Sequence, residues 1–222
     1  MKKSLLVVVA AIITASAMPV HAQVRITEVS PWGSGNAPYM TDWFELTNTG
    51  AVALNITGWK MDDNSNLFAS SVGLTGITSI APGESVIFTE NAATANFLST
   101  WFGGSPPAGL QIGNYTGGGV GLGTSGDAVN IFNAAGVLQA NVSFGASPAG
   151  PLFPTFDNAA GLNNGTISTL SAAGTNGAFV AANDANEIGS PGRIAAIPEP
   201  QTYAMVLTGL TLIGAFVRNR RR

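Results

Sequence analysis

Apolar and polar residues alternate in the chain that follows residue 23, a pattern typical of β-strands. Residues 43–48 (WFELTN) place Phe44 and Leu46 on one side and Glu45 and Thr47 on the other. Acidic side chains on such strands usually face water. We therefore expect a half-buried strand here, with its carboxylate exposed.

Further strands follow the same rule. A turn at residues 81–84 (APGE) leads into residues 85–90 (SVIFTE), where alternate apolar residues share a face. Residues 126–144 form the clearest hairpin in the chain. Its two apolar faces are joined at Ala134-Ala135-Gly136, with the glycine in the left-handed position. Weaker strand signals occur at residues 54–56 and 77–80.

One short helix is also expected. Asn91 could cap a helix that carries Phe97 and Trp101 and is stopped by Gly103-Gly104, forming a lid on the edge of the sheets. Residues 146–186 are rich in Ala, Gly, Asn and Ser, and here we expect long loops with one or two strands.

These strands carry motifs that resemble the bacterial type of lamin tail domain. The motifs I/V-x-E-V, D-x-F-E-L-x-N and L-x-I-x-G-W fall on Ile26, Glu28, Val29, Asp42, Phe44, Glu45, Leu46, Asn48, Leu54, Gly58 and Trp59. G-D-x-V-x-I at residues 126–131 and G-S-P-G at residues 189–192 also match. The resemblance implies an all-β fold, an immunoglobulin-like antiparallel β-sandwich spanning residues 23–194.

The N-terminus has the pattern of a secretory signal peptide over residues 1–22. Lys2 and Lys3 precede a short apolar run, and signal peptidase is expected to cut between Ala22 and Gln23. The apolar run is too short to favour a membrane span.

The C-terminus, residues 195–222, resembles the PEP-CTERM sorting signal. Pro198-Glu199-Pro200 precedes an apolar segment, predicted as a transmembrane helix at about 202–217, and an arginine cluster that would stay in the cytoplasm. The apolar core 203–217 would reach about 22 Å, short of the roughly 30 Å bilayer core. The resemblance implies that an exosortase recognises Pro198, Glu199 and Pro200 and removes the tail. A permanent anchor is the alternative.

Charge and residue types narrow the function classes. Without Lys2, Lys3 and the four arginines of the tail, three basic residues (Arg25, Lys60 and Arg193) stand against the twelve acidic residues between Glu28 and Glu199, a net charge near 3 − 12 = −9. Such a surface repels phosphate backbones, so no nucleic-acid partner is expected. The chain has no cysteine, and its one histidine, His21, leaves with the signal peptide. Thiolate and imidazole catalysis and the usual zinc ligands are thereby excluded.

Two acid-based chemistries stay open. Asp42 with Glu45, or Asp62 with Asp63, could serve a carboxylate-dependent glycan hydrolase. Asp62, Asn64 and Asn66 have the opening spacing of a calcium loop, although Leu67 replaces its glycine and Gly73 its final glutamate. Calcium is the one cofactor that the sequence suggests.

Two other stretches each allow a functional and a structural interpretation. Residues 121–126 satisfy G-x-G-x-x-G, but a hairpin rather than a helix follows them, so we expect a turn instead of a dinucleotide site. The loop that carries Trp32 and Tyr39 is a candidate contact surface. The alternative is that Trp32 folds back on the sandwich.

The sequence therefore predicts an exported, non-enzymatic binding or structural protein. The PEP-CTERM resemblance implies transient anchoring in the inner membrane of a Gram-negative bacterium. It also implies a final place at the cell surface or in the extracellular matrix, associated with exopolysaccharide and biofilm. Polysaccharide or another envelope protein is the expected partner.

Overall fold

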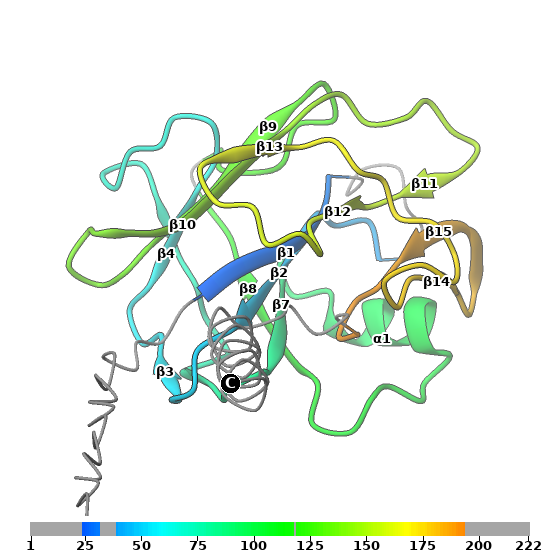
Figure 1. The fold of residues 1–222 in the computed structure, drawn as a ribbon, viewed down its shortest axis with the longest axis horizontal. Helices are drawn as coiled ribbons and strands as arrows, with labels where there is room; N and C mark the ends of the chain where they lie inside the picture. Colours follow the sequence, from blue (N-terminus) through cyan, green and yellow to red (C-terminus); the bar gives the residue numbers. More distant parts are fainter. Residues whose placement is uncertain (1–23, 32–38, 118, 194–222) are drawn as a thin grey trace, which may run out of the picture.

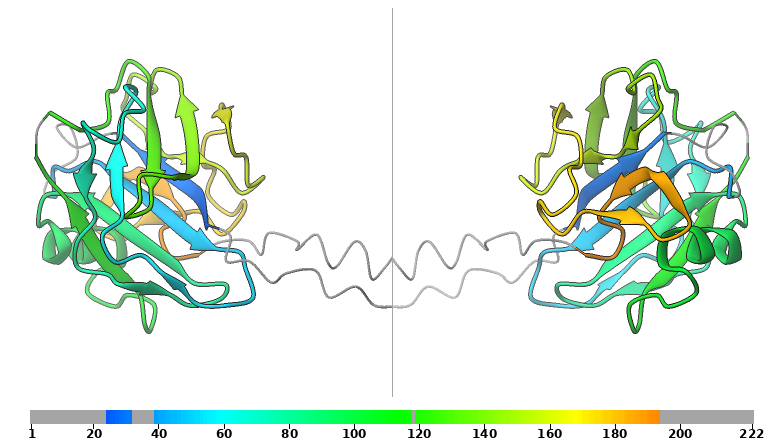
Figure 2. Two further views of the ribbon diagram at one scale, coloured as in Figure 1. Left: turned by 90° about the vertical axis from the view of Figure 1, so that its left-hand side faces the viewer. Right: turned by 90° about the vertical axis from the view of Figure 1, so that its right-hand side faces the viewer.

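The structure is a computed structural model that describes residues 24–31, 39–117 and 119–193. Both predicted processing signals, the predicted helix at 202–217 and Trp32 lie outside these residues. Within them, two five-stranded sheets pack face to face (Figures 1 and 2). The described part of the chain is thus a β-sandwich: the alternation predicts its strands, and the resemblance to the lamin tail domain implies their arrangement in a sandwich.

The first sheet has the strand order β12-β1-β2-β7-β8. Its strands are β1 (Val24–Ser30), β2 (Trp43–Asn48), β7 (Ser85–Glu90), β8 (Gln111–Tyr115) and β12 (Phe156–Asp157). The second sheet has the order β13-β10-β9-β4-β5. Its strands are β4 (Lys60–Asp62), β5 (Val72–Gly73), β9 (Asp127–Phe132), β10 (Leu138–Phe144) and β13 (Gly165–Ile167).

Two smaller groups of strands complete the fold. A three-stranded sheet has the order β11-β15-β14, and β3 pairs with β6. Their bounds are β3 (Leu54–Asn55), β6 (Ser79–Ile80), β11 (Phe153–Pro154), β14 (Phe179–Ala181) and β15 (Asp184–Gly189). The expectation of one or two strands within residues 146–186 is therefore wrong, because five short strands begin there. Four of them have only two or three residues, too few for alternation to stand out, and the six residues of β15 (DANEIG) contain a single large apolar residue, Ile188.

Most neighbouring strands are antiparallel, but the predicted purely antiparallel sandwich needs correction. β7 and β8 pair in parallel, as do β10 with β13 and β11 with β15. A parallel pair needs a crossover connection, and residues 91–110, which contain the helix, supply the one between β7 and β8.

The inner faces of the two large sheets form the main core. Alternate residues from each strand meet there, and the Phe44 ring lies 5.6 Å from the Phe88 ring and 5.5 Å from the Tyr115 ring. The hairpin also forms as predicted. Gly136 has φ +78°, and its N–H donates to the Asn133 carbonyl at 2.9 Å.

The outer face of the first sheet is covered as well, so β2 is buried along its whole length. The helix α1 (Thr94–Phe102) packs on this face beside β14, as Figure 1 shows. Trp43 and Ile87 of the sheet pack against Phe97 and Trp101 of the helix. The predicted lid therefore lies over a sheet face rather than along an edge.

The helix ends as predicted but begins differently. Gly103 adopts φ +59° and its N–H donates to the Ser99 carbonyl. The N-cap residue is Ala93, without a side-chain cap. Asn91 lies two residues earlier with φ +65°, and its N–H donates to the Tyr115 carbonyl, so its backbone turns the chain out of β7. Across residues 24–31, 39–117 and 119–193, no helix has the length and apolar character to span a bilayer.

Candidate functional site

A β-bulge in β1 creates the most unusual arrangement in the structure. The pairing of β1 with β2 shifts between Ile26 and Glu28, which leaves Thr27 as an extra residue. Ile26 and Val29 therefore both face the main core. Thr27 and Glu28 both point to the outer face, where strict alternation would allow only one of them.

The bulge brings Glu28 directly opposite Glu45 on β2. Both side chains are almost fully buried, with exposed fractions of 0% and 1%. Cβ atoms of such cross-strand partners lie about 4.5–5.5 Å apart. Two carboxyl groups thus share one closed space, which we call the carboxyl pair.

Neutral donors hold the carboxyl pair. Oε1 of Glu28 accepts a hydrogen bond from the Ser190 N–H at 2.7 Å and another from the Thr155 hydroxyl, and Oε2 accepts one from the Ser190 hydroxyl at 3.2 Å. Oε1 of Glu45 accepts from the Thr27 hydroxyl at 2.8 Å, and Oε2 accepts from the Gly192 N–H at 2.6 Å. The carboxyl pair therefore binds the end of the described chain.

The segment that it binds, residues 189–193, is shaped for this contact, and we call it the C-terminal segment. A Cβ atom on Gly189 would lie 2.6 Å from Glu28 Oε1 and 2.9 Å from Trp101, so only glycine fits. Gly192 has φ +70°, a conformation that favours glycine. The Arg193 guanidinium lies over the Phe179 ring at 4.4 Å. The G-S-P-G motif is thus the part of the segment that fits the carboxyl pair.

Burial changes the acidity of both groups. Burial, together with the charge of Glu45, raises the pKa of Glu28 from 4.5 to about 8. Burial also raises the pKa of Glu45 to about 7, against the opposing effect of the hydrogen bonds from Thr27 and Gly192. The carboxyl pair therefore takes up protons near neutral pH.

Two more acidic residues lie near the carboxyl pair. Asp157 on β12 is the cross-strand partner of Glu28, and its oxygens accept from the Ala159 N–H and the Asn176 amide. Glu187 on β15 is fully buried and accepts a hydrogen bond from the Tyr39 hydroxyl at 3.0 Å. Each of these carboxylates holds a different segment of the chain on the outer face.

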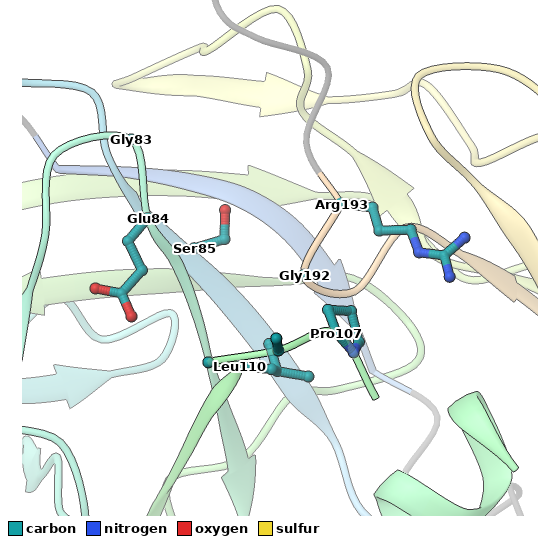
Figure 3. Close-up of a pocket in the computed structure, with 9 residues that line it drawn as sticks. Gly83, Glu84, Ser85, Pro107, Leu110, Gly192 and Arg193 are labelled. Carbon is teal, nitrogen blue, oxygen red and sulfur yellow. The ribbon is translucent and has the colours of Figure 1, made fainter. Parts of the chain in front are cut away.

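A cleft of about 300 Å³ lies beside the C-terminal segment, lined by residues 83–85, 107–110 and 192–193. Figure 3 shows the Leu110 side chain beneath Gly192, while Glu84 and Arg193 point away from each other. Glu84 is already bound to the Gln111 amide and the Ala81 N–H. The cleft thus combines an apolar floor with charged groups that are engaged elsewhere.

The carboxylates expected for a hydrolase do not come together. Asp42 continues the core-facing side of β2 and its Oδ2 accepts from the Leu122 N–H, whereas Glu45 belongs to the outer face. Three residues of extended chain also separate the two by about 10 Å. The expectation that Glu45 faces water is wrong, because α1 and the C-terminal segment cover that face.

The second pair is also unsuited to catalysis. Asp62 is fully buried, and its Oδ2 accepts from the Ser65 hydroxyl at 2.6 Å and the Leu67 N–H at 2.7 Å. Asp63 Oδ1 accepts from the Ser65 N–H at 3.3 Å. These contacts close the turn that follows β4.

The calcium candidates lie in this turn. Asn64 and Asn66 are exposed, and Asn66 adopts φ +51°. Asp62 Oδ1 is buried without a hydrogen-bond partner in the described part of the chain. In that same part, no three Asp, Glu, His or Cys side chains converge as a metal site would require.

The remaining predicted sites are structural. The G-x-G-x-x-G stretch is a loop before β9, and Asp42 and Asp127 accept from the N–H groups of Leu122 and Gly123. Tyr39 is buried, with 4% of its surface exposed, so the expectation that it lies in an exposed contact loop is wrong. Its ring packs against Phe97.

The sequence does not predict the carboxyl pair. Glu28 stands out in it only as a position of the I/V-x-E-V motif, because nothing in the sequence marks the bulge. One signal was available in the motifs themselves. Both glutamates and the G-S-P-G turn at residues 189–192 are among the motifs on which the resemblance to the lamin tail domain rests, and these are the parts that meet in space.

The comparison with known families agrees with this fold. The family model described as Lamin Tail Domain matches residues 17–146, more than half of the chain. That range covers β1 to β10, including both glutamates of the carboxyl pair. No curated protein matches the chain. From its sequence and its fold, this chain belongs to the lamin tail domain family.

Proposed function

We propose that this chain is a non-enzymatic binding or structural module, exported to the envelope or extracellular matrix of a Gram-negative bacterium. Membership of the lamin tail domain family supports a non-enzymatic module. The signal-peptide pattern at residues 1–22 and the Pro198-Glu199-Pro200 pattern before an apolar segment support export and exosortase sorting. Signal peptidase and exosortase are then its partners during export.

The observation that carries the non-enzymatic proposal is the closure of the carboxyl pair. A glycosidase needs two carboxyl groups that reach both the sugar and a water molecule. Glu28 and Glu45 are buried and their oxygens accept hydrogen bonds from Thr27, Ser190 and Gly192. Substrate could reach them only if the C-terminal segment left the sheet.

The nature of the surface supports a polysaccharide or protein partner. The acidic body disfavours nucleic acid, as its charge predicts. Asn, Ser, Thr and Gly are abundant in the exposed loops and supply neutral hydrogen-bonding groups. We propose exopolysaccharide of the biofilm matrix as the partner class.

Sorting is tested with the full chain in an exosortase-bearing host and in the same strain without that enzyme. A Pro198→Ala/Pro200→Ala variant is compared with Gln201→Ala, which leaves the Pro-Glu-Pro motif unchanged. We expect a shortened, released form for the wild type and for the control. The tail should stay attached, in the membrane fraction, in the deletion strain and in the double variant. Equal release in all four cases would refute exosortase sorting.

Binding and catalysis are separated on one set of glycans. The protein released by the wild-type strain is screened for co-sedimentation with exopolysaccharide and for the appearance of new reducing ends. We expect retention without hydrolysis. Turnover that Glu45→Gln abolishes would establish the hydrolase alternative.

A calcium-dependent adhesion module is the second candidate, and one observation favours it. Asp62 Oδ1 is buried without a hydrogen-bond partner among the residues that the structure describes, and a cation would compensate it. Asn64 and Asn66 follow at calcium-loop spacing. Calorimetric titration with calcium, repeated on Asn64→Ala, tests this candidate. Absence of heat at millimolar calcium would end it.

A further inference from the structure

The hydrogen-bond partners of the carboxyl pair fit both the ionised and the protonated form of each group. Each carboxyl accepts from one backbone N–H, which can only donate: Ser190 for Glu28 and Gly192 for Glu45. Glu28 also contacts the Ser190 hydroxyl, and Glu45 contacts the Thr27 hydroxyl. A hydroxyl can donate to a carboxylate or accept from a carboxylic acid.

A proton therefore has a defined place on each group. It can sit on Glu28 Oε2, which would then donate to the Ser190 hydroxyl at 3.2 Å. It can also sit on Glu45 Oε1, which would donate to the Thr27 hydroxyl at 2.8 Å. Thr27 in turn lies 2.9 Å from the Thr47 hydroxyl, which offers it an alternative acceptor. Protonation thus preserves both backbone hydrogen bonds to the C-terminal segment.

Double ionisation is the state that this arrangement cannot accommodate well. Two like charges directly opposite each other on neighbouring strands are destabilising, and a buried charge also loses its hydration. The charged and titratable groups of the neighbouring elements add little positive compensation. Asp157 and Glu187 are acidic, Tyr39 donates to Glu187, and Arg193 lies over Phe179. The first turn of α1 contains no acidic residue, and its last turn contains no basic residue.

We propose that Glu28 and Glu45 form a proton-sensitive clasp for the C-terminal segment. The clasp is closed while at least one carboxyl is protonated, and it opens when both are ionised. Opening removes residues 189–193 from the outer face and exposes the carboxyl pair to water.

The acidity of the pair agrees with this behaviour. Burial and the neighbouring charge raise the pKa of Glu28 to about 8, and burial raises the pKa of Glu45 to about 7. The last proton of the carboxyl pair is therefore lost in the mildly alkaline range. Because the two groups are coupled, the transition belongs to the pair rather than to either residue. The proposal concerns the folded body and holds whether or not the chain is exported.

Hydrogen–deuterium exchange of the full chain in detergent tests the clasp. Exchange rates of the Ser190 and Gly192 amides are divided by their intrinsic rates at each pH, which leaves the protection factor. We expect this factor to fall about tenfold or more between pH 6 and pH 9 in the wild type, because one pKa unit corresponds to a tenfold change in equilibrium. Amides in β9 and β10 report on global unfolding and should keep their protection.

Two variants and one control decide the outcome. Glu28→Gln/Glu45→Gln keeps the shape and leaves one acceptor oxygen on each side chain for the Ser190 and Gly192 N–H groups, but it cannot ionise, so its protection factor should stay constant with pH. Glu45→Gln alone can never carry two charges in the pair, so its protection factor should also stay nearly constant with pH, and it replaces the double variant if that variant does not fold. Glu84→Gln removes a carboxyl that lines the neighbouring cleft and should behave like the wild type. A fall of equal size in the double variant, or constant protection in the wild type, would overturn the proposal.

Discussion

Glu28 and Glu45 face each other across β1 and β2, closed off from water by the C-terminal segment. Cross-strand carboxylates normally lie on a solvated face, where their repulsion is screened. Here they accept hydrogen bonds from the C-terminal segment, in which Ser190 is 162 residues away from Glu28 in sequence. The outer face of this sheet is therefore an interior, and burial there raises the pKa of both carboxyls.

Stability should decrease as the pH rises through neutrality. In the unfolded chain both carboxyls titrate near 4.5, whereas in the folded chain the pKa values are about 8 for Glu28 and about 7 for Glu45. Between these values the folded state binds more protons, so raising the pH favours unfolding. The stabilisation is fully present below about pH 4.5 and is lost by about pH 8.

Urea unfolding at pH 5 and pH 8 measures this effect. We expect the wild type to lose at least about 2 kcal/mol between the two values, since one pKa unit corresponds to about 1.4 kcal/mol. Glu28→Gln/Glu45→Gln should show a much smaller loss. If the double variant lost as much unfolding free energy as the wild type, the pH dependence would belong to other groups.

Gly189→Ala should destabilise the protein. The new Cβ atom would lie 2.6 Å from Glu28 Oε1 and 2.9 Å from Thr155 Cγ2, inside van der Waals contact. Overpacking of this kind costs about 1–3 kcal/mol. Gly73→Ala is the matched control, because a Cβ there meets nothing within 4 Å. Thermal unfolding of both variants should show a lower midpoint for Gly189→Ala alone.

Asn48→Ala tests the last position of the D-x-F-E-L-x-N motif. The Asn48 amide is buried and donates to the carbonyls of Val52 at 2.8 Å and Ile80 at 3.0 Å, and its Oδ1 accepts from the Gly50 N–H. Losing these bonds leaves buried backbone groups without partners, at about 2–4 kcal/mol in total.

Asn55→Ala is the comparison, because the Asn55 Oδ1 accepts a single exposed hydrogen bond from the Thr57 N–H. We expect its free energy of unfolding to change by less than about 1 kcal/mol. Equal effects of the two substitutions would contradict the role given to Asn48.

Phe97→Ala should loosen the helix from the outer face. The Phe97 ring packs edge-on against Tyr39 and Trp43, with centroids 5.5 Å apart in each case. Truncating a buried phenylalanine costs about 3–5 kcal/mol. Leu98→Ala, on the partly buried side of α1, should cost less. Near-ultraviolet circular dichroism reports the tryptophan packing, and it should weaken in Phe97→Ala before global unfolding.

Alternation was enough to predict which strand residues meet in the main core. Phe44, Leu46, Val86 and Phe88 face inward as expected, and the hairpin turn at residues 134–136 forms with Gly136 at positive φ. The end of α1 at Gly103 was equally readable. The turn after β2 was not, because Asn48 shapes it through its own side chain, whose Oδ1 accepts a hydrogen bond from the Gly50 N–H.

The sequence by itself thus determined the main β-strands, their core-facing residues and the shortage of catalytic side chains, because these depend on local periodicity and residue type, while its family motifs implied the sandwich. Only the tertiary structure decided where the acidic residues lie. The bulge at Thr27 turns Glu28 to the outer face, and α1 and the C-terminal segment bury what alternation assigns to water. The physical reason is that the burial of a strand's second face depends on distant segments. Local periodicity does not indicate which distant segments will cover that face.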